Sequence, residues 1–555
     1  MKIINFFWLF LLVSACSKKN ECIIINTDSI IFVEKKSQQL KTDEIKNWLI
    51  KDIYDDTIPG ISLLRAKRDL LQKKPGDTVI VALIDMPLDV NHEKLQKHIW
   101  VNKGEISDNK MDDDVNGYVD DANGWNFLGN SMGENIVFMN YEYTRILRAK
   151  NEIDCLNKLN DVISNQYDRA EKAYLKRMKY AKEALDNAKK SDSFYFGVKN
   201  TLLPYVSGQE ISIERLDSLL SSGFENENLV NAIETYKIFL DEKIDDTYIK
   251  QGSLMAMERL NILLNLEYND RTVIGDNSCD IDDTNYGNNM VAHNLELMNH
   301  ATLMAGIIIS DFNEEELEDI MSKIMIMPLC VSGFGDEHDK DISLAIRYAV
   351  DNGANIINIS SGKYFSLHED WVHDAIRYAD SKDVLIITSS GNEGLDLDSK
   401  NVFKYPNDKD LSNNYEISNN FIRVGSSNYT LDSTLVNSAT NYGKSEVDIF
   451  APGEEIYTTS AKKEKYSFTS GTSASAAVVS KTAAILKSYF PHLRASQLKD
   501  ILLKTGIEYN LSVQMKDSLD QKIVIPFNEL SKSGKIVNLY NALQLAEVLT
   551  ENTRN

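Results

Sequence analysis

The amino-acid sequence predicts an α/β fold in which a parallel sheet is flanked by helices. The first observation is an unbroken apolar, β-branched run, 78–85, that is typical of a strand buried on both faces. The second is a regular downstream alternation of strand and helix patterns, which indicates βαβ units and parallel strands. Strand patterns lie at 323–329, 354–359, 383–388, 421–425 and 447–450, and helical patterns lie at 341–350 and 368–381.

A stretch of different composition, 130–285, separates the two halves of this pattern. It is dominated by Leu, Ala, Lys, Glu and Tyr at helical spacing, most clearly between residues 168 and 190. There the small and apolar residues fall mostly on one stripe of a helix. We therefore expect a large helical insertion, packed against the α/β core, whose Tyr and Met residues serve ordinary core packing.

The N-terminal residues have the features of a signal peptide. Lys2 precedes an apolar run at 3–13, and small residues then lead to Cys16. The run is shorter than the roughly 20 residues that a membrane-spanning helix needs. A buried strand or helix of the mature fold is the alternative, which the position at the extreme N-terminus disfavours. The polar, lysine-rich segment that follows, 17–44, is expected to be a tether.

The overall charge excludes one class of partner. The formal net charge is -23 at pH 7, and an acidic surface of this kind repels a phosphate backbone. We therefore expect no nucleic-acid partner. The hydrophobic fraction of 43% is ordinary for a globular protein, so the chain can form a sizeable core.

The remaining cysteines are too few to build a disulfide scaffold in an exported protein of this length. They are Cys22, Cys155, Cys279 and Cys330. A disulfide between Cys155 and Cys279 is compatible with the sequence, but the spacing does not decide the pairing.

Three segments place a reactive side chain at the end of a strand or the start of a helix. Asp85 ends the first buried strand, at the edge where α/β sheets form their sites. His300 and Ser473 each begin an apolar helix. An imidazole can take the proton of a serine hydroxyl, and a buried carboxylate can hold that imidazole in the required tautomer. Singly, these residues are typical of a turn, a structural histidine and a helix N-cap. The order Asp, His, Ser favours a nucleophilic triad.

The segments around these residues resemble the motifs of the subtilase family of serine peptidases. Residues 471–477, Gly-Thr-Ser-Ala-Ser-Ala-Ala, are similar to the family's Gly-Thr-Ser-Met-Ala-Ala-Pro motif. Residues 300–306, His-Ala-Thr-Leu-Met-Ala-Gly, are similar to its His-Gly-Thr-His-Val-Ala-Gly motif. The strand that ends at Asp85, with His92 seven positions on, resembles the Asp motif, and 451–453 resembles the Ala-Pro-Gly before the nucleophile. The resemblance implies a subtilisin-like parallel sheet, interrupted by the helical insertion between the Asp and His motifs.

The resemblance also implies an activity. It indicates a serine endopeptidase that hydrolyses peptide bonds through an acyl-enzyme on Ser473, with Asp85 and His300 completing the triad. The loop Ser-Ser-Gly-Asn-Glu-Gly at 389–394 resembles the one whose Asn donates a hydrogen bond to the oxyanion, which implies that role for Asn392. No cofactor is required for this chemistry.

A further resemblance concerns the substrate, which is expected to be a protein or peptide. Residues Ser360, Ser361 and Gly362 resemble the edge segment that pairs with an extended chain through backbone hydrogen bonds. Glu393 follows the oxyanion Asn. Its charge favours a basic or neutral substrate side chain in the first specificity pocket.

Departures from the family pattern leave a second hypothesis open. Met86 replaces a hydroxyl residue that in the family binds the Asp carboxylate, and Pro87 replaces a Gly and fixes φ. Leu303 replaces the second His of its motif, Ala301 replaces a Gly, and Ala477 replaces the Pro after the nucleophile. None of these changes removes a reactive atom. The alternative they allow is a catalytically degenerate subtilase-fold lipoprotein that binds peptides or partner proteins.

An acidic loop offers oxygen ligands at alternating positions, with a Gly at the sixth, which resembles the first half of a calcium loop. The ligands are Asp112, Asp114, Asn116, Tyr118 through its carbonyl, and Asp120. Position twelve is Asn123 rather than a bidentate glutamate, so a solvated acidic turn is the alternative. Because subtilases often bind calcium, we expect a structural calcium ion here.

The residues Val-Ser-Ala-Cys that end at Cys16 resemble a bacterial lipobox. The resemblance implies lipid attachment at this cysteine and an exported protein, anchored to a bacterial membrane on its periplasmic or cell-surface side. Too few residues separate Cys16 from Asp85 for a separate chaperone-like propeptide, which is therefore not expected. The predicted order is a lipoprotein signal peptide (1–16), a tether (17–44), a peptidase domain in two parts (45–129 and 286–548) around the insertion (130–285), and a tail (549–555).

Overall fold

The computed structural model describes residues 40–71, 76–149, 153–206, 210–223, 226–309, 317–410, 415–517 and 521–554. The predicted signal peptide, the lipidation site Cys16, Cys22 and most of the tether lie outside these ranges, as does the side chain of Cys155. Within the described ranges, no helix combines the length and the apolar character needed to cross a membrane.

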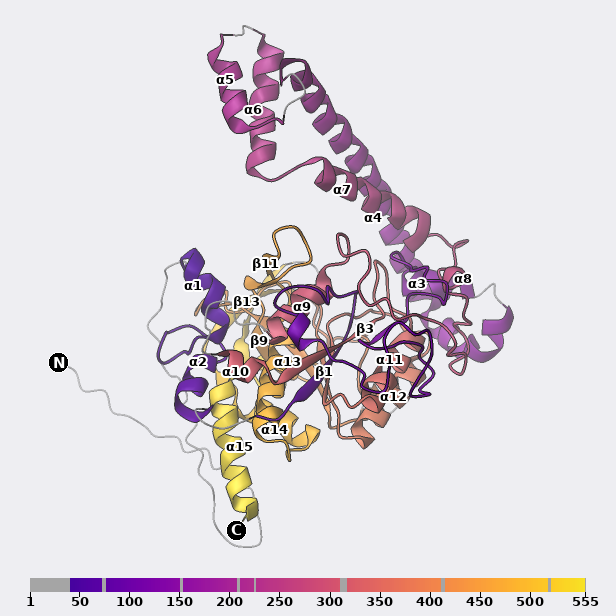
Figure 1. The fold of residues 1–555 in the computed structure, drawn as a ribbon, viewed down its shortest axis with the longest axis vertical. Coiled ribbons are helices and arrows are strands. Elements are labelled where there is room, and N and C mark those ends of the chain that lie inside the picture. Colours follow the sequence, from indigo (N-terminus) through magenta and orange to yellow (C-terminus); the bar gives the residue numbers. More distant parts are fainter. Residues whose placement is uncertain are drawn as a thin grey trace, which may run out of the picture.

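A nine-stranded sheet forms the centre of the core, in the order β12-β15-β9-β8-β5-β4-β1-β3-β2 (Figure 1). Every neighbouring pair is parallel except β12 and β15 at one edge. The predicted parallel α/β sheet is therefore confirmed. The strands are β1 (Val79–Asp85), β2 (Trp125–Asn126), β3 (Ile324–Cys330), β4 (Ile356–Ile359), β5 (Leu385–Ser389), β8 (Phe421–Ser427), β9 (Ile449–Pro452), β12 (Ile507–Glu508) and β15 (Lys535–Ile536).

Helices cover both faces of this sheet, which explains why the sequences of its central strands are continuous apolar runs. Val81 and Leu83 of β1 pack into one hydrophobic cluster, while Ala82 and Ile84 pack into the other. The first cluster includes residues of α9 (His300–Ile309), α13 (Thr472–Tyr489), α14 (Ala495–Thr505), α15 (Leu539–Arg554), α2 (Leu63–Ala66) and α10 (Glu318–Met321). The second includes residues of α11 (Asp339–Asp351) and α12 (Glu369–Ser381).

The helical insertion projects from the core as an arm (Figure 1). Its longest helix, α4, contains 54 residues, and at a rise of 1.5 Å per residue it extends over about 80 Å. The prediction that the insertion packs against the core is right only for its base, because α5 and α6 lie far from the sheet (Figure 1). The helices are α3 (Glu142–Ala149), α4 (Ile153–Val206), α5 (Ile213–Ser221), α6 (Glu227–Asp241), α7 (Asp246–Glu258) and α8 (Arg271–Ile274).

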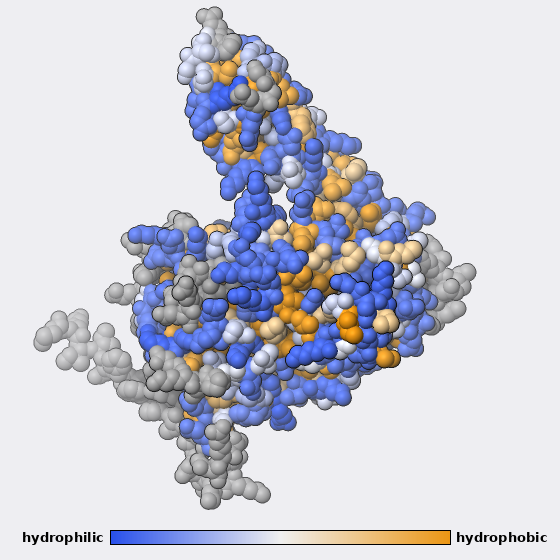
Figure 2. All heavy atoms as spheres, viewed as in Figure 1, coloured by the Kyte–Doolittle hydropathy of each residue, from blue (hydrophilic) through white to orange (hydrophobic). Residues whose placement is uncertain are grey.

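The distal part of the arm has a small hydrophobic core of its own. Tyr195 and Leu202 of α4 pack there with Leu216 of α5 and with Ile233 and Tyr236 of α6. Figure 2 shows hydrophilic and hydrophobic residues mixed on the surface of the arm, and hydrophobic residues gathered on the core face beneath it. The distal part of the arm is thus held together by its own hydrophobic cluster rather than by the sheet.

The remaining elements are short. Two-stranded antiparallel sheets are formed by β6 (Lys409–Asp410) with β7 (Tyr415–Glu416), β10 (Ile456–Thr459) with β11 (Tyr466–Thr469), and β13 (Ser512–Lys516) with β14 (Lys522–Pro526). Helical turns lie at Trp48–Ile50, Lys67–Leu71, Gln96–His98, Arg259–Leu263 and Phe527–Glu529. Helix α1 (Thr42–Asn47) begins inside the predicted tether, and the predicted tail continues α15 as far as Arg554.

Two cysteines can be placed. Cys279 is disulfide-bonded, but the side chain of Cys155, whose pairing with Cys279 the sequence left undecided, lies outside the described residues. Cys330 is a buried free thiol at the end of β3, in register with Asp85 of β1. Burial and the nearby Asp85 carboxylate both raise the pKa of the Cys330 thiol. It therefore behaves as a packed apolar residue rather than as a nucleophile.

Candidate active site

The sequence-predicted site residues come from the carboxyl edge of the sheet and from the starts of two helices. Asp85 ends β1, Ser360 directly follows β4, and Asn392 lies in the loop after β5. His300 is the first residue of α9 and Ser473 the second residue of α13, and these two helices pack on the same face of the sheet. A parallel sheet gathers the ends of its strands at one edge, which explains how residues far apart in the chain meet.

Asp85 and His300 form a direct pair. His300 Nδ1 lies 2.7 Å from Oδ1 and 2.9 Å from Oδ2 of Asp85. The Asp85 side chain is buried, while that of His300 is 32% exposed, so the outer edge of the imidazole faces solvent. The backbone N–H of Met86 donates to Asp85 Oδ1 at 2.7 Å. Met86 thus supplies through its main chain a hydrogen bond to the carboxylate, although its side chain has no hydroxyl.

The electrostatic environment favours the protonated form of His300. Burial by itself lowers the pKa of the imidazole, but the charge and hydrogen bond of Asp85, with a further contribution from Glu337, outweigh it and raise the pKa above the ordinary value. An imidazole in this state accepts a proton from a donor more readily than a free histidine does. The pair therefore suits a general base that must become transiently charged.

Ser473 lies in the first turn of α13, where its backbone N–H is not needed for the helix ladder. Its hydroxyl donates to the carbonyl of Ser360 at 2.8 Å, while the Ser360 hydroxyl lies 2.7 Å from Asn358 Oδ1 and 3.3 Å from the Ser473 carbonyl. Among the described residues, no hydrogen bond joins Ser473 to His300. Catalytic hydrogen bonds of this kind often form only when substrate displaces the resting contact. Rotation about one side-chain bond releases the hydroxyl from Ser360.

Asn392 is positioned by the residue that precedes the serine. Its Oδ1 accepts from the backbone N–H of Thr472 at 2.9 Å and from the Thr472 hydroxyl at 3.1 Å. Because a backbone N–H can donate only to the oxygen of the amide, Nδ2 is left available as a donor. Gly471, at φ +134°, allows the close approach, since an added Cβ would lie 3.2 Å from the Asn392 amide. Nδ2 and the Ser473 N–H are thus two donors beside one hydroxyl.

The segment predicted to hold substrate is braced on one side. The residue after Gly362, Lys363, exchanges two backbone hydrogen bonds with Tyr405, at 3.0 and 2.8 Å. Ser361 Oγ is buried and has no hydrogen-bond partner among the described residues. The structure therefore brings Ser360, Ser361 and Gly362 next to Ser473, on a segment whose backbone is fixed by its neighbours.

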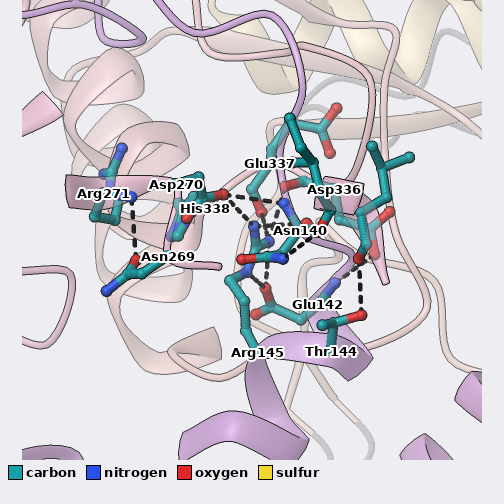
Figure 3. Close-up of polar contacts among 12 residues, drawn as sticks. Asn140, Glu142, Thr144, Arg145, Asn269, Asp270, Arg271, Asp336, Glu337 and His338 are labelled. Atoms are coloured by element: carbon teal, nitrogen blue, oxygen red, sulfur yellow. Dashed lines mark hydrogen bonds and ion pairs between the residues drawn. The ribbon is translucent and has the colours of Figure 1, made fainter. Parts of the chain in front are cut away.

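A buried ionic cluster, missed by the sequence analysis, joins the base of the insertion to the core (Figure 3). Arg145 of α3 binds Glu142 at 2.6 Å and donates to the carbonyls of Asp336 and Glu337 at 2.8 and 2.9 Å. Asp270, just before α8, lies 3.1 Å from Nε2 of His338. Figure 3 shows these side chains gathered around Arg145, between the insertion and the segment that follows β3. The insertion is therefore anchored through charges, not only through apolar packing.

The acidic loop folds differently from the predicted calcium ligand set. Asp112 accepts hydrogen bonds from the backbone N–H groups of Asn116 and Gly117, at 3.0 and 2.8 Å. Asp120 likewise accepts from the backbone of Asn109 and Lys110, at 3.1 and 2.6 Å. These carboxylates thus stabilise turns of the loop by accepting from its backbone N–H groups. Neither lies in the acidic group that could hold a cation.

That group consists of Glu105, Asp114 and Asp121. Their carboxylate oxygens lie within 4.8 Å of one another. Glu105 Oε2 is buried without a hydrogen-bond partner among the described residues, and Asp121 is fully buried. Three converging carboxylates with an unsatisfied oxygen suit a hard cation such as calcium. Of the predicted ligands only Asp114 belongs to this set. Asp121 adjoins the predicted Asp120, but Glu105 lies outside the spacing pattern.

Two further residues near the site were not predicted to have a functional role. Thr472, which orients Asn392, is part of the serine motif but is not itself a reactive residue. Lys404 is buried beside Gly362. The two residues belong to no common sequence motif, so the sequence did not indicate this contact. Leu303 stands where the family motif has its second His. Its side chain packs against the hydrophobic cluster on the α9 face.

The fold and site together define an α/β protein with an Asp–His pair and a serine in the first turn of a helix, at the carboxyl edge of its sheet. The model of the subtilase family matches residues 76–523, and the chain belongs to this family. The match includes the helical insertion as well as both parts of the core.

Curated relatives include two proteases from Bacillus. A cell wall-associated protease of Bacillus subtilis (strain 168) is 34% identical over 230 residues, which are 40% of this chain and 23% of that protein. A thermophilic serine proteinase of Bacillus sp. (strain AK1) is 31% identical over 196 residues, which are 35% of this chain and 44% of that protein. The matched region thus spans less than half the length of either relative.

Solved structures give a weaker similarity. A lanthipeptide protease has 25% sequence identity and a TM-score of 0.34, covering 44% of this chain and 75% of its own. The epidermin leader peptide processing serine protease of Staphylococcus aureus has 20% identity and a TM-score of 0.37, covering 48% of this chain and 66% of its own.

Proposed function

We propose that this protein is a serine endopeptidase that cleaves extended polypeptide segments through an acyl-enzyme on Ser473. The observation that carries the proposal is the 2.7 Å contact between Asp85 and Nδ1 of His300. This contact leaves the other imidazole nitrogen, Nε2, as the proton acceptor. The site belongs to a chain of the subtilase family, whose curated relatives are named as proteases. Those names give the non-catalytic alternative no support.

The first chemical step would transfer one proton and form one bond. Ser473 Oγ attacks the carbonyl carbon of the scissile peptide while its proton passes to Nε2 of His300. The carbonyl electron pair moves onto oxygen, and that negative charge is stabilised by Asn392 Nδ2 and the Ser473 N–H at the start of α13. Asp85 stabilises the imidazolium.

The second step would break the C–N bond. His300 returns its proton to the leaving amine, and the substrate's acyl group stays on Ser473 as an ester. A water molecule then attacks the ester carbonyl, with His300 again as the base. Hydrolysis regenerates the serine hydroxyl and releases a carboxylate product. Every proton in this cycle passes through one imidazole, so the raised pKa of His300 sets the lower pH limit of activity.

Peptide hydrolysis by the purified protein tests the proposal. We expect internal cleavage of a peptide library, detected by mass spectrometry, and loss of that cleavage in Ser473→Ala. Ser475→Ala is a suitable matched control, because Ser475 is a buried serine of the same helix whose hydroxyl donates to the Ala451 carbonyl. The proposal is wrong if the natural protein and Ser473→Ala cleave the library alike, or if the folded natural protein cleaves nothing.

We also propose that the protein is exported and carries lipid on Cys16. The support is the apolar run at 3–13 followed by small residues and a cysteine. Expression in a bacterium with a radiolabelled fatty acid should label the natural protein but not Cys16→Ser. Label in both proteins, or in neither while the protein is exported, would contradict it.

Finally, we propose that Glu105, Asp114 and Asp121 hold a structural calcium ion. Their convergence and the unsatisfied Glu105 oxygen support this ligand set over the one read from the loop spacing. A bound calcium ion would supply the positive charge that three adjacent carboxylates lack, and would take no part in the reaction.

A further inference from the structure

Lys404 is a buried cation without a direct partner. Only 7% of its surface is exposed, yet its ammonium forms no hydrogen bond or ion pair with any residue that the structure describes. Burial lowers the pKa of this ammonium, and the more distant charges of Glu393 and Glu337 oppose the shift. An unpaired buried charge is costly, and proteins retain one mainly where a ligand completes it.

The Lys404 ammonium points at the segment predicted to hold substrate. A Cβ added to Gly362 would lie 2.3 Å from Lys404 Nζ, so the absence of a side chain at this position leaves the space for the ammonium. The ring of Tyr364 lies on another side, with its centroid 5.4 Å from Nζ. The Lys404 ammonium therefore lies against Gly362, and the face of the Tyr364 ring stabilises it there.

We call the segment at Gly362 one wall of the space beside Ser473. The opposite wall is the loop that carries Asn392. An added Cβ on Gly391 would lie 3.0 Å from the Tyr364 hydroxyl and 2.8 Å from Glu393 Oε2, so Tyr364 connects the two segments. A substrate whose carbonyl carbon bonds to Ser473 and whose oxygen binds Asn392 directs the side chain of that same residue between these walls. Lys404 borders this space at Gly362.

Glu393 does not cancel this positive charge. Its carboxylate accepts hydrogen bonds from the Tyr364 hydroxyl and from Asn441 Nδ2, the latter at 3.1 Å. Its negative charge is therefore stabilised locally, and it forms no ion pair with Lys404 among the described contacts. The sequence-based expectation of a basic or neutral side chain rests on Glu393 alone. It did not include the buried lysine, whose charge is the one left without a partner.

We propose that Lys404 binds the carboxylate of an acidic substrate residue, so that the enzyme cleaves after Glu or Asp. The inference rests on the proposed peptidase function and names its substrate class. A substrate carboxylate would give Lys404 the charge-assisted hydrogen bond it lacks. A neutral amide of the same shape offers no compensating charge, and a basic side chain would place two cations together.

A peptide series that varies only in the residue before the scissile bond tests this assignment. The residues are Glu, Gln, Lys and Leu, and kcat/KM is measured for the natural protein, Lys404→Met and Lys404→Gln. A charged hydrogen bond is worth about tenfold or more in transition-state binding. We therefore expect Glu to exceed Gln by at least about tenfold in the natural protein, and the two to become equal in both variants. Lys400→Met, an exposed lysine of the same connection, should keep the natural ratio.

The possible outcomes distinguish a failure of the Lys404 proposal from a failure of the proposed peptidase function. Cleavage of the series with Gln equal to or better than Glu overturns the role of Lys404 while leaving the peptidase in place. A Glu preference that survives in Lys404→Met and Lys404→Gln also overturns it. A folded natural protein that cleaves no peptide and does not react with a fluorophosphonate overturns both proposals.

Discussion

The Lys363 ammonium lies 3.1 Å from a carboxylate oxygen of Glu142, so a side chain of the helical insertion pairs with the residue that follows the proposed substrate segment. Asp339 lies 2.8 Å from the same ammonium, and the Glu337 carbonyl accepts from it at 2.7 Å. Lys363 is fully buried by these partners. The insertion therefore helps to fix the substrate segment and is not merely an appended arm.

Replacing Glu142 should weaken both the fold and substrate binding. In Glu142→Gln the buried Lys363 and Arg145 lose one of the carboxylates that neutralise them, and removal of one member of a buried ion pair costs about 3 kcal/mol. We expect a lower melting temperature and a kcat/KM reduced chiefly through a higher KM, because the segment 360–362 is then less firmly held. Thermal unfolding and steady-state kinetics on one peptide measure the two effects.

A matched substitution on the exposed arm tests whether any Glu→Gln change in the insertion has the effects expected for Glu142→Gln. Glu234 is an exposed residue of α6, so Glu234→Gln should leave both the melting temperature and KM unchanged. If Glu142→Gln lowers stability but leaves KM at the natural value, the insertion stabilises the fold without positioning the substrate segment.

Asp85→Asn should lower activity and shift its pH dependence. The carboxylate raises the pKa of His300, whereas burial alone lowers it. The base must be neutral, so activity rises with pH through this pKa, and the acid limb should move to lower pH in the variant. We expect kcat/KM to fall about ten-thousandfold, since the imidazole also loses its oriented tautomer.

The measurement is a kcat/KM profile over pH for the natural protein and the variant. Asp89→Asn is the control, because Asp89 lies in the loop after β1 and forms no hydrogen bond with His300 among the described contacts. An acid limb at the same pH in Asp85→Asn and the natural protein would show that His300 is not the titrating base.

Asn392→Ala should reduce kcat without changing KM. Only the developing oxyanion needs the Nδ2 donor, so the loss appears in the transition state and not in substrate binding. We expect a fall of about a hundred- to a thousandfold, a magnitude measured on a subtilisin. Steady-state kinetics on a single peptide give both parameters, and a fall in kcat of less than about tenfold would assign the oxyanion to other donors.

The α/β core could be predicted because its elements carry local signals. The run that ends at Asp85 became β1, and the alternation after residue 323 became β3, α11, β4, α12 and β5. The shape of the insertion could not be predicted, because helical spacing shows which face of a helix is apolar but not what covers it. In α4, Ala170 packs in a cluster with Phe365 of the core, whereas Tyr195 and Leu202 pack with residues of α5 and α6.

The candidate site was only partly predictable for a similar reason. Asp85, His300, Ser473 and Asn392 lie in short motifs, and the structure brings them to one edge of the sheet. Their catalytic roles stay predictions until tested. Lys404 lies in a connection without such a motif, and only folding brings its side chain under Gly362. In the acidic loop the spacing suggested alternating ligands, but turn formation used Asp112 and Asp120 to bind backbone N–H groups instead.

Calcium should stabilise the natural protein through Asp114. Binding of a ligand to the folded state alone raises the melting temperature as its concentration exceeds the dissociation constant. We expect a rise at millimolar calcium that is reversed by a chelator and lost in Asp114→Ala. Asp241→Ala, an exposed acid at the end of α6, should keep the rise. No rise in the natural protein, or an equal rise in Asp114→Ala, would show that these three carboxylates do not hold a structural calcium ion.

Reaction with a fluorophosphonate tests the central claim most directly, because the reagent labels only a serine that an adjacent base activates. The account predicts that the natural protein is labelled once, that mass spectrometry locates the label on Ser473, and that Ser473→Ala is not labelled while Asp85→Asn reacts far more slowly. Absence of label in the folded natural protein, or a label on a different serine, would contradict it.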